Sequence, residues 1–212
     1  MFRDRIEAGF ALAEKLKKYK NDPGLVLAVP RGGVPIAYIV AKELGFPLDL
    51  VLTKKIGHPA NKEYAIGAVS LTDSYVVPHE HVSEKYIEAQ IIHIRRRLHE
   101  MYKTFMGDKE PESIKGKTLI VIDDGIATGN TLIATINMLK KGQPDKIVIA
   151  VPVASSNSVQ KLSPEVDELV CLLVPEVFFG VGAFYENFSQ VSDEEVMDYL
   201  TKLKEEKNKK RA

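Results

Sequence analysis

The chain has 212 residues, of which 45% are hydrophobic, so it is long enough to form one domain with a real core. Its 29 basic and 29 acidic residues cancel, which argues against a dedicated duplex-binding protein, because such proteins carry a basic excess. The single cysteine, Cys171, excludes an intrachain disulfide, and no apolar run approaches the roughly 18 residues of a membrane span. We therefore expect a soluble, cytoplasmic protein with neither nucleic acid nor membrane among its partners.

Helical and strand patterns alternate through the first half of the chain. Apolar spacing and turn residues predict, in order, a helix over about 3–20, a strand over 25–29, a helix to about 44, a strand over 48–53, a hairpin around 72–74 and a helix over 83–105. Residues 54–64 show no periodicity, and we expect them to form a mobile loop.

The second half continues the alternation. Its predicted elements are a strand over 118–122, a helix over 130–141, a strand over 146–151, a helix near 155–162, a strand over 169–174 and a helix that begins after Ser192. Glu195 stands three residues after Ser192, which is the spacing of a capping box.

This order predicts an α/β fold with a doubly wound, mostly parallel sheet and helices on both faces. We expect a single domain over residues 1–205 and a charged tail, 206–212, that frays. Ligands of such sheets bind beyond the carboxyl ends of the strands. The non-repetitive segments 30–33, 54–64 and 123–131 should therefore meet at one crevice.

The segment from Thr118 to Thr131, TLIVIDDGIATGNT, carries the strongest functional signal. An apolar strand leads into the pair Asp123 and Asp124, and a turn with Gly, Thr and Asn leads into a helix. Backbone amides at a helix N-terminus hold phosphate well. Two acids repel bare phosphate, so the pattern favours a ligand that also carries hydroxyls or Mg²⁺. The alternative, a polar capping turn, explains one or two of these residues but not the whole pattern.

This segment resembles the signature of the type I phosphoribosyltransferases, which bind phosphoribosyl pyrophosphate (PRPP). The resemblance implies that fold, with a small hood built from chain-end segments, and a Mg²⁺-dependent transferase of nucleotide metabolism. The wording DDGIATGNT looks closest to adenine-type members, which also carry Ala before Thr-Gly. Hypoxanthine-guanine-type members carry Asp there as a proton acceptor, a role that Ala127 cannot fill.

The resemblance assigns the motif residues to two parts of PRPP. Asp123 and Asp124 would contact the ribose hydroxyls, directly or through metal-bound water, and are the implied metal-contacting residues. The implied contacts of the 5-phosphate are Ile126, Ala127, Thr128, Gly129, Asn130 and Thr131.

Pro30-Arg31-Gly32-Gly33 is the second candidate element. Two glycines after a strand let a backbone approach an anion closely, although an ordinary strand–helix turn explains them as well. Beside the PRPP signature, the segment looks like the family's pyrophosphate loop, with Arg31, Gly32 and Gly33 as contacts. In relatives the peptide before the equivalent basic residue is often cis, so we predict a cis bond between Pro30 and Arg31.

Lys54 and Lys55 open the segment expected to be a loop. It is either a solvated surface loop or a flexible catalytic loop whose lysines neutralise pyrophosphate and whose closure excludes water. Glu63 is the candidate for proton transfer, because Ala127 cannot serve. Phe178 matches a base-stacking Phe of purine-type relatives, although paired phenylalanines are more often core residues.

Three hypotheses follow. The first is a phosphoribosyltransferase that uses PRPP and a nucleobase-like nitrogen acceptor; the second is a non-catalytic sensor of PRPP or a nucleotide on the same fold. The third, a sugar-phosphate hydrolase, lacks a visible nucleophile or metal cluster. His79 and His81 have metal-like spacing but no third ligand pattern. Relatives are often dimers, and the apolar stripe of the 83–105 helix can pack internally or across a homodimer.

Overall fold

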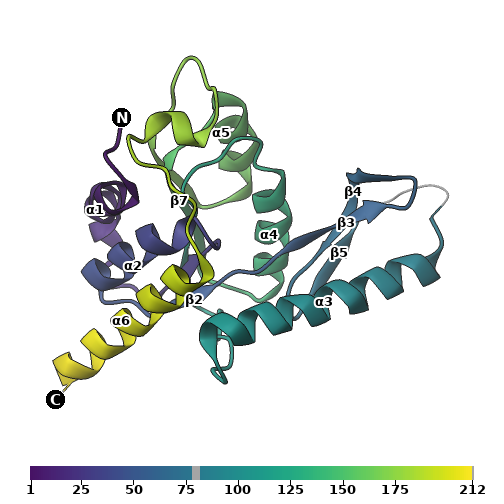
Figure 1. The fold of residues 1–212 in the computed structure, drawn as a ribbon, viewed down its shortest axis with the longest axis horizontal. Helices are drawn as coiled ribbons and strands as arrows, with labels where there is room; N and C mark the ends of the chain where they lie inside the picture. The colour runs from purple at the N-terminus through teal and green to yellow at the C-terminus, as the bar shows by residue number, and fades with distance from the viewer. Residues whose placement is uncertain (78–81, 212) are drawn as a thin grey trace.

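Five parallel strands form the central sheet of the computed structural model, which describes residues 1–77 and 82–211 (Figure 1). Their order across the sheet is β2-β1-β6-β7-β8. The strands are β1 (Gly24–Ala28), β2 (Leu48–Leu50), β6 (Thr118–Ile122), β7 (Lys146–Val153) and β8 (Glu168–Leu173). The predicted α/β architecture is confirmed, and the chain winds from β1 in both directions across the sheet.

Helices cover both faces of this sheet because the side chains of each strand alternate between two cores. Val26 and Ala28 of β1 belong to one apolar cluster, whereas Leu25 and Leu27 belong to the other. The first face is covered by α1 (Arg5–Leu16), α2 (Gly33–Leu44) and α6 (Asp193–Arg211). The second face is covered by α4 (Asn130–Lys141) and α5 (Ser156–Leu162). Short 3-10 turns follow α1 (Lys17–Tyr19) and α5 (Ser163–Glu165).

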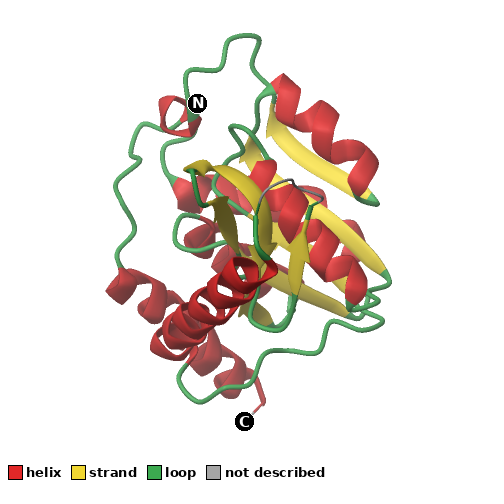
Figure 2. Cartoon of the chain, turned by 90° about the vertical axis from the view of Figure 1, so that its right-hand side faces the viewer, coloured by secondary structure: helices red, strands yellow, loops and turns green. Residues whose placement is uncertain are grey.

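We call the five-stranded sheet and the helices that cover it the body. A three-stranded antiparallel sheet projects from the body together with the longest helix (Figures 1 and 2). We call this unit the arm. It consists of β3 (Lys54–His58), β4 (Asn61–Val69), β5 (Ser74–Val76) and α3 (Glu84–Met106). The hairpin predicted around residues 72–74 is confirmed as the β4–β5 connection.

The prediction of a mobile loop over 54–64 is wrong, because these residues form the β3–β4 hairpin. Ile56 and Ile66 are fully buried and belong to the same cluster as Ile87 and Ile94 of α3. Backbone pairing and these apolar contacts therefore order the segment. A register shift at Gly57 interrupts the two-residue alternation, which explains why no strand pattern was visible in the sequence.

The apolar stripe of α3 packs internally, with Ile87, Ile94 and Leu98 in the core of the arm. Ser83 caps the helix by accepting a hydrogen bond from the Tyr86 amide, at 3.3 Å. Homodimerisation stays a prediction. His79 and His81 lie outside the described residues.

Segments from the two ends of the chain form the expected hood, at the top of the view in Figure 1. The amide of Phe2 donates to the Phe184 carbonyl at 2.8 Å, and the amide of Glu186 donates to the Phe2 carbonyl at 2.8 Å. A 3-10 turn (Val181–Phe184) lies within the hood, and Tyr185 is buried there.

Helix α6 begins with the predicted capping box, which is confirmed: Ser192 and Glu195 exchange amide-to-side-chain hydrogen bonds of 2.8 and 3.2 Å. The helix continues to Arg211, so the segment expected to fray is helical up to that residue. In the part of the chain that the structure describes, helices are all too short or too polar to cross a bilayer.

Candidate functional site

Two loops lie side by side where β1 and β6 end. The strands are neighbours in register from Gly24 opposite Thr118 to Ala28 opposite Ile122. The amide of Val29 extends this pairing by donating to the Ile122 carbonyl at 2.8 Å. The segments 30–33 and 123–131 therefore leave the sheet next to each other, at the position where α/β folds bind ligands.

The glycines of the first loop are required by this close packing. A Cβ on Gly32 would lie 1.9 Å from Oδ2 of Asp124, and a Cβ on Gly33 would lie 2.5 Å from the Ile122 carbonyl oxygen. No larger residue fits at either position without displacing the second loop. The peptide bond between Pro30 and Arg31 is cis, which confirms the prediction.

Asp124 is held by an arginine from the N-terminal segment of the chain. Nε and Nη2 of Arg5 donate to Oδ2 of Asp124 at 3.0 and 2.8 Å. The Tyr185 hydroxyl donates to the Asp124 carbonyl at 2.7 Å. Burial and the nearby Asp124 carboxylate raise the pKa of Tyr185 above its usual range, which keeps this hydroxyl a donor.

Asp123 has different surroundings from its neighbour. Its Oδ1 accepts the Asp124 amide at 2.8 Å. Burial, and then the adjacent Asp124 carboxylate, raise the pKa of Asp123 well above its usual range. The two acids therefore differ. Asp124 is held by a cation, whereas ionisation of Asp123 costs free energy until a positive or hydrogen-bonding partner binds it.

The second loop enters α4 through a glycine that needs its conformational freedom. Gly129 has a φ of +72° and is the N-cap of α4. The first amides of a helix have no partner within it, so those of α4 are available to an anion. Ala127, Thr128, Asn130 and Thr131 are exposed around this turn.

Ile126 does not fit the role expected for it. Its side chain is 3% exposed, and its amide donates to the Val153 carbonyl at 2.9 Å. In this conformation the amide cannot also contact a phosphate. Ile126 instead anchors the loop to the end of β7, and the candidate phosphate contacts reduce to the segment 127–131.

Two serines support this loop from behind and were missed in the sequence. Ser155 caps α5 and donates from its hydroxyl to the Ala127 carbonyl at 2.7 Å. The Ser158 hydroxyl lies 3.3 Å from the Ile126 carbonyl. Because these carbonyls point back to α5, the loop can direct its amides outward. Ser-x-x-Ser before an apolar run is a cap signal, but nothing in it indicates contact with a distant loop.

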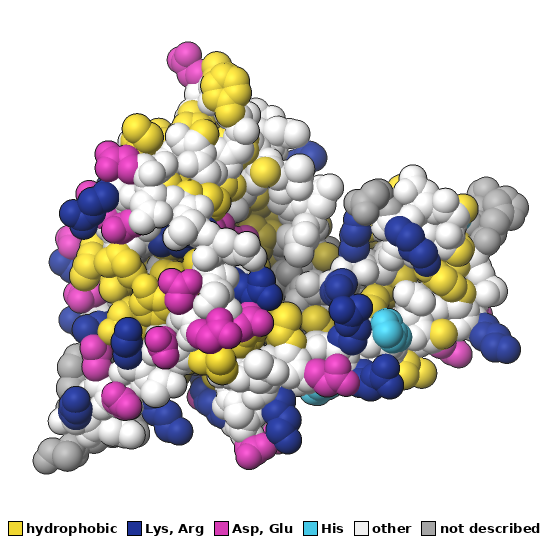
Figure 3. All heavy atoms as spheres, viewed as in Figure 1, with side chains coloured by type: hydrophobic (Ala, Val, Ile, Leu, Met, Phe, Trp, Pro, Cys, Tyr) yellow, Lys and Arg dark blue, Asp and Glu magenta, His cyan; other side chains and the backbone are white. Residues whose placement is uncertain are grey.

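The lysines expected to bind pyrophosphate lie on the arm. Lys54 and Lys55 are exposed at the start of β3, opposite Val69 and Ala68 of β4. Glu63 lies on β4. Lys and Arg side chains gather on the arm where it borders a hollow against the body (Figure 3). Arg31, on the body, forms an ion pair with Asp193 at the start of α6.

The phenylalanine that lines the space beside Asp124 is Phe188 rather than Phe178. Phe178 stacks on Phe184, with ring centroids 5.6 Å apart, inside the hood cluster. A cavity of about 440 Å³ beside Asp124 is lined by Phe188 but not by Phe178. The other lining residues are Arg5, Arg31, Gly32, Asp124, Ser189, Gln190 and Val191.

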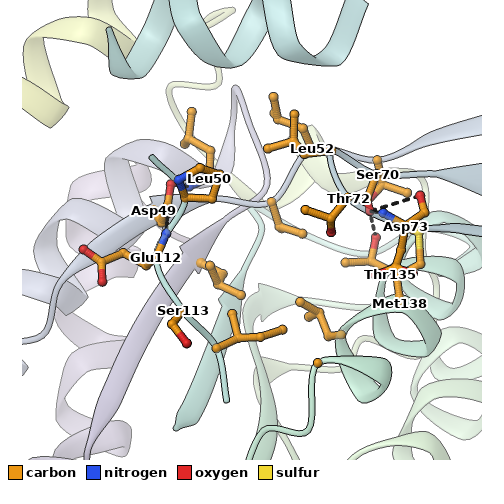
Figure 4. A pocket seen from close by; sticks show the side chains of 18 residues that line it. Asp49, Leu50, Leu52, Ser70, Thr72, Asp73, Glu112, Ser113, Thr135 and Met138 are labelled. Carbon is orange, nitrogen blue, oxygen red and sulfur yellow. Dashed lines mark hydrogen bonds between the residues drawn. The ribbon is translucent and has the colours of Figure 1, made fainter. Parts of the chain in front are cut away.

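A second cavity, of about 300 Å³, lies between β2, α4 and the β4–β5 turn, away from the acid pair (Figure 4). Its deepest charged group, Asp49, is already engaged, because it accepts hydrogen bonds from Leu50, Tyr102 and Glu112 at 2.7–2.8 Å. The remaining lining is largely apolar. This cavity lacks the convergent polar groups of a catalytic site.

The carboxylate oxygens of Asp123 and Asp124 suit Mg²⁺, which prefers oxygen ligands, keeps several bound waters and takes few ligands from the protein. Residues 1–77 and 82–211 contain no cluster of three or more His, Cys, Asp or Glu side chains that could hold a metal. A metal ion at Asp123 and Asp124 would therefore take its remaining ligands from water and substrate.

Comparison with known proteins gives a consistent result. Residues 4–187 match a family model described as phosphoribosyl transferase domain. A Mycobacterium tuberculosis (strain H37Rv) protein named "Putative phosphoribosyl transferase" is 36% identical over 209 residues, which cover 94% of this chain. The match covers 46% of that protein, so this chain spans less than half the length of its curated relative.

Solved structures share the fold. The crystal structure of TT1426 from Thermus thermophilus is 36% identical and matches with a TM-score of 0.86, covering 96% of this chain and 99% of that one. A hypothetical protein from Neisseria gonorrhoeae with bound ppGpp is 16% identical with a TM-score of 0.52, covering 96% and 92%. At that identity the second match concerns the fold alone.

Proposed function

Since the chain belongs to the phosphoribosyl transferase domain family, we propose that it transfers a phosphoribosyl group from PRPP to a nitrogen of a nucleobase-like acceptor and releases pyrophosphate. The observation that carries the proposal is the contact of the Gly32-Gly33 loop with Asp124, beside a glycine-capped helix N-terminus. A phosphate, two vicinal hydroxyls and a second anionic group have matching partners within this one crevice.

The donor occupies the site through three sets of contacts. Residues 127–131 and the first amides of α4 bind the 5-phosphate, with Thr128 and Thr131 adding hydroxyl donors. Asp123 and Asp124 accept hydrogen bonds from the ribose hydroxyls. Arg31 and the amides of Gly32 and Gly33 bind the pyrophosphate, and Lys54 and Lys55 reach it from the arm.

In the reaction, a ring nitrogen of the acceptor attacks the anomeric carbon while the bond from that carbon to the pyrophosphate oxygen breaks. The leaving electron pair stays on pyrophosphate, so positive side chains there lower the barrier most. Bound Mg²⁺ would neutralise part of the same charge, held through water by Asp123 and Asp124. The acceptor's proton goes to a base, for which Glu63 stays the candidate.

A screen for pyrophosphate release tests the proposal. The protein is incubated with PRPP, Mg²⁺ and, in turn, adenine, hypoxanthine, guanine, xanthine, uracil and orotate. At least one acceptor should give turnover that Thr128→Val abolishes and Thr201→Val leaves unchanged. Thr201 is an exposed threonine on α6, so its variant controls for the substitution itself.

Two other results count against the proposal. PRPP binding by calorimetry without turnover of any acceptor would favour the non-catalytic sensor. Turnover that survives Thr128→Val would remove the assignment of the phosphate site.

A further inference from the structure

We propose that Arg5 is a positioning residue that orients Asp124 toward the ribose hydroxyls of the donor and links the hood to the donor site. This inference rests on the proposed function, because it assigns Asp124 to the ribose. Arg5 belongs to none of the motifs that mark the donor site, and it enters the site from the first turn of α1.

The guanidinium of Arg5 fixes one oxygen of Asp124 and one carbonyl of the hood. Nε and Nη2 lie 3.0 and 2.8 Å from Oδ2 of Asp124, and Nη1 lies 2.8 Å from the Ser189 carbonyl oxygen. The planar fork thus joins the loop that carries Asp124 to the segment that carries Ser189. With Oδ2 held, Oδ1 of Asp124 is the oxygen left to accept a ribose hydroxyl.

Packing holds the guanidinium itself in place. The ring of Phe188 lies 4.0 Å from Cζ of Arg5, and the side chain of Arg5 is 10% exposed. Tyr185 contributes a second cation–π contact at 6.0 Å and binds the Asp124 carbonyl. Residues 185–189 therefore grip both Arg5 and Asp124, and movement of this segment moves the carboxylate.

A purely structural role explains this arrangement poorly. A buried ion pair is often no more stabilising than apolar residues of similar size, because both charges lose their hydration. Here the cation binds the one acidic side chain that lines the 440 Å³ cavity, beside Gly32 and Arg31. A side chain that contacts a ligand is placed accurately only where a second residue holds it. Arg5 is in the position to hold Asp124 in this way.

The test compares Arg5→Lys with Arg3→Lys. Lysine keeps the charge but loses the fork, so it cannot hold Oδ2 and the Ser189 carbonyl together. Arg3 lies two residues away, and its side chain is 71% exposed, so the same substitution there is the matched control. Calorimetry measures binding of ribose 5-phosphate and of inorganic phosphate, with thermal unfolding as a check of folding.

We expect Arg5→Lys to weaken ribose 5-phosphate binding at least about tenfold and to leave phosphate binding within about twofold. Arg3→Lys should change neither. In an Asp124→Asn background, Arg5→Lys should add no further loss for ribose 5-phosphate, because both changes remove the same contact. If Arg5→Lys does not fold, Phe188→Leu provides the same comparison by loosening the guanidinium.

The two possible failures are distinguishable. A wild-type protein that binds ribose 5-phosphate no better than phosphate would overturn the proposed function and this inference with it. A wild-type preference for ribose 5-phosphate that Arg5→Lys leaves intact would overturn only the role of Arg5. Equal loss of both ligands would also overturn it, because that outcome indicates general damage to the loop.

Discussion

The body and the arm carry their functional side chains in different ways. On the body, Gly32 leaves no room for an added methyl group beside Asp124, and Arg5 holds Asp124 by hydrogen bonds. On the arm, Lys54 and Lys55 are exposed at the start of the β3–β4 hairpin. Lys and Arg side chains of the arm border a hollow against the body (Figure 3). If the chain binds PRPP as proposed, the sugar, the 5-phosphate and part of the pyrophosphate meet a preformed surface on the body, and the arm adds its lysines to the leaving group.

Gly32→Ala should have the largest effect. Its Cβ would lie 1.9 Å from Oδ2 of Asp124, so the acid and its partner Arg5 must move. We expect turnover to fall about 1,000-fold or more, since displacement by about 1 Å can alone cost about 100-fold. Steady-state pyrophosphate release measures this loss.

Gly45→Ala is the control, because no atom lies within 4 Å of a Cβ there. Because Gly45 has a φ of +78°, alanine there should lower the free energy of unfolding by about 1 kcal/mol and leave kcat unchanged. Equal activity of the Gly32→Ala and Gly45→Ala variants would show that the close packing around Gly32 does not fix the site.

Lys55→Ala should have the next largest effect and should act differently. If Lys55 neutralises the leaving group, kcat falls about 100-fold while the KM for PRPP changes little. Lys85→Ala, which removes an exposed lysine near the start of α3, should be neutral. A large rise in KM with unchanged kcat would instead indicate that Lys55 binds the substrate equally well before and in the transition state. The arm and the body would then both act as binding surfaces for the substrate.

Tyr86→Phe probes how firmly the hairpin is attached. The Tyr86 hydroxyl donates to the Gly57 carbonyl at 2.8 Å and accepts from Nζ of Lys62 at 2.7 Å. Loss of this link should cost about 1 kcal/mol and speed amide exchange in residues 54–62 alone. Exchange that also rises in residues 123–131 would indicate that arm and body are one cooperative unit.

Glu168→Gln should have the smallest effect and concerns the stability of the body. Burial acts to raise the pKa of Glu168, but hydrogen bonds from Lys18 and Tyr19 outweigh it, so the pKa is lowered. The charged form thus stabilises the fold above the ordinary glutamate pKa of about 4.3, and this contribution is lost as the pH falls through the lowered value.

At pH 7 we expect Glu168→Gln to lower the free energy of unfolding by about 1 kcal/mol, because the ion pair is partly screened. Chemical denaturation at pH 7 and at a series of lower pH values measures the difference, which should shrink as the pH falls through the lowered pKa of Glu168. Activity should stay normal. A loss that is constant with pH would mean that packing, rather than charge, makes the difference.

Much of the body could be predicted from the sequence because its signals are local. An apolar strand followed by Asp123-Asp124 and Thr128-Gly129 identifies a strand, a turn and a helix within fourteen residues. The capping box at Ser192 was also predicted and confirmed. Both of these features depend on neighbours in the chain. The cis bond at Pro30–Arg31, also confirmed, was predicted from the family resemblance instead.

The features that were missed depend on residues far apart in the chain. Arg5 meets Asp124 across 119 positions, and Ser155 meets Ala127 across 28. Phe10 is an apolar residue of the first helix but is 52% exposed, whereas the buried face of α1 includes Arg5. The sequence did show a charged residue, Arg5, at helical spacing with Ala8 and Leu12. It gave no indication that Asp124 is the partner of this residue.

The pairing of residues 2–5 with residues 184–189 in the hood has a consequence for the order of folding. Nη1 of Arg5 reaches the Ser189 carbonyl across 184 positions, and Phe2 pairs with residues on either side of Tyr185. Contacts of such long range carry a large loop-closure entropy and form late. During synthesis, the sheet and the turn before α4 can assemble while Ser189 is still inside the ribosome. Asp124, the carboxylate proposed to bind ribose, gains the complete arginine clamp only after that residue has emerged, so the fold is largely complete before the site is.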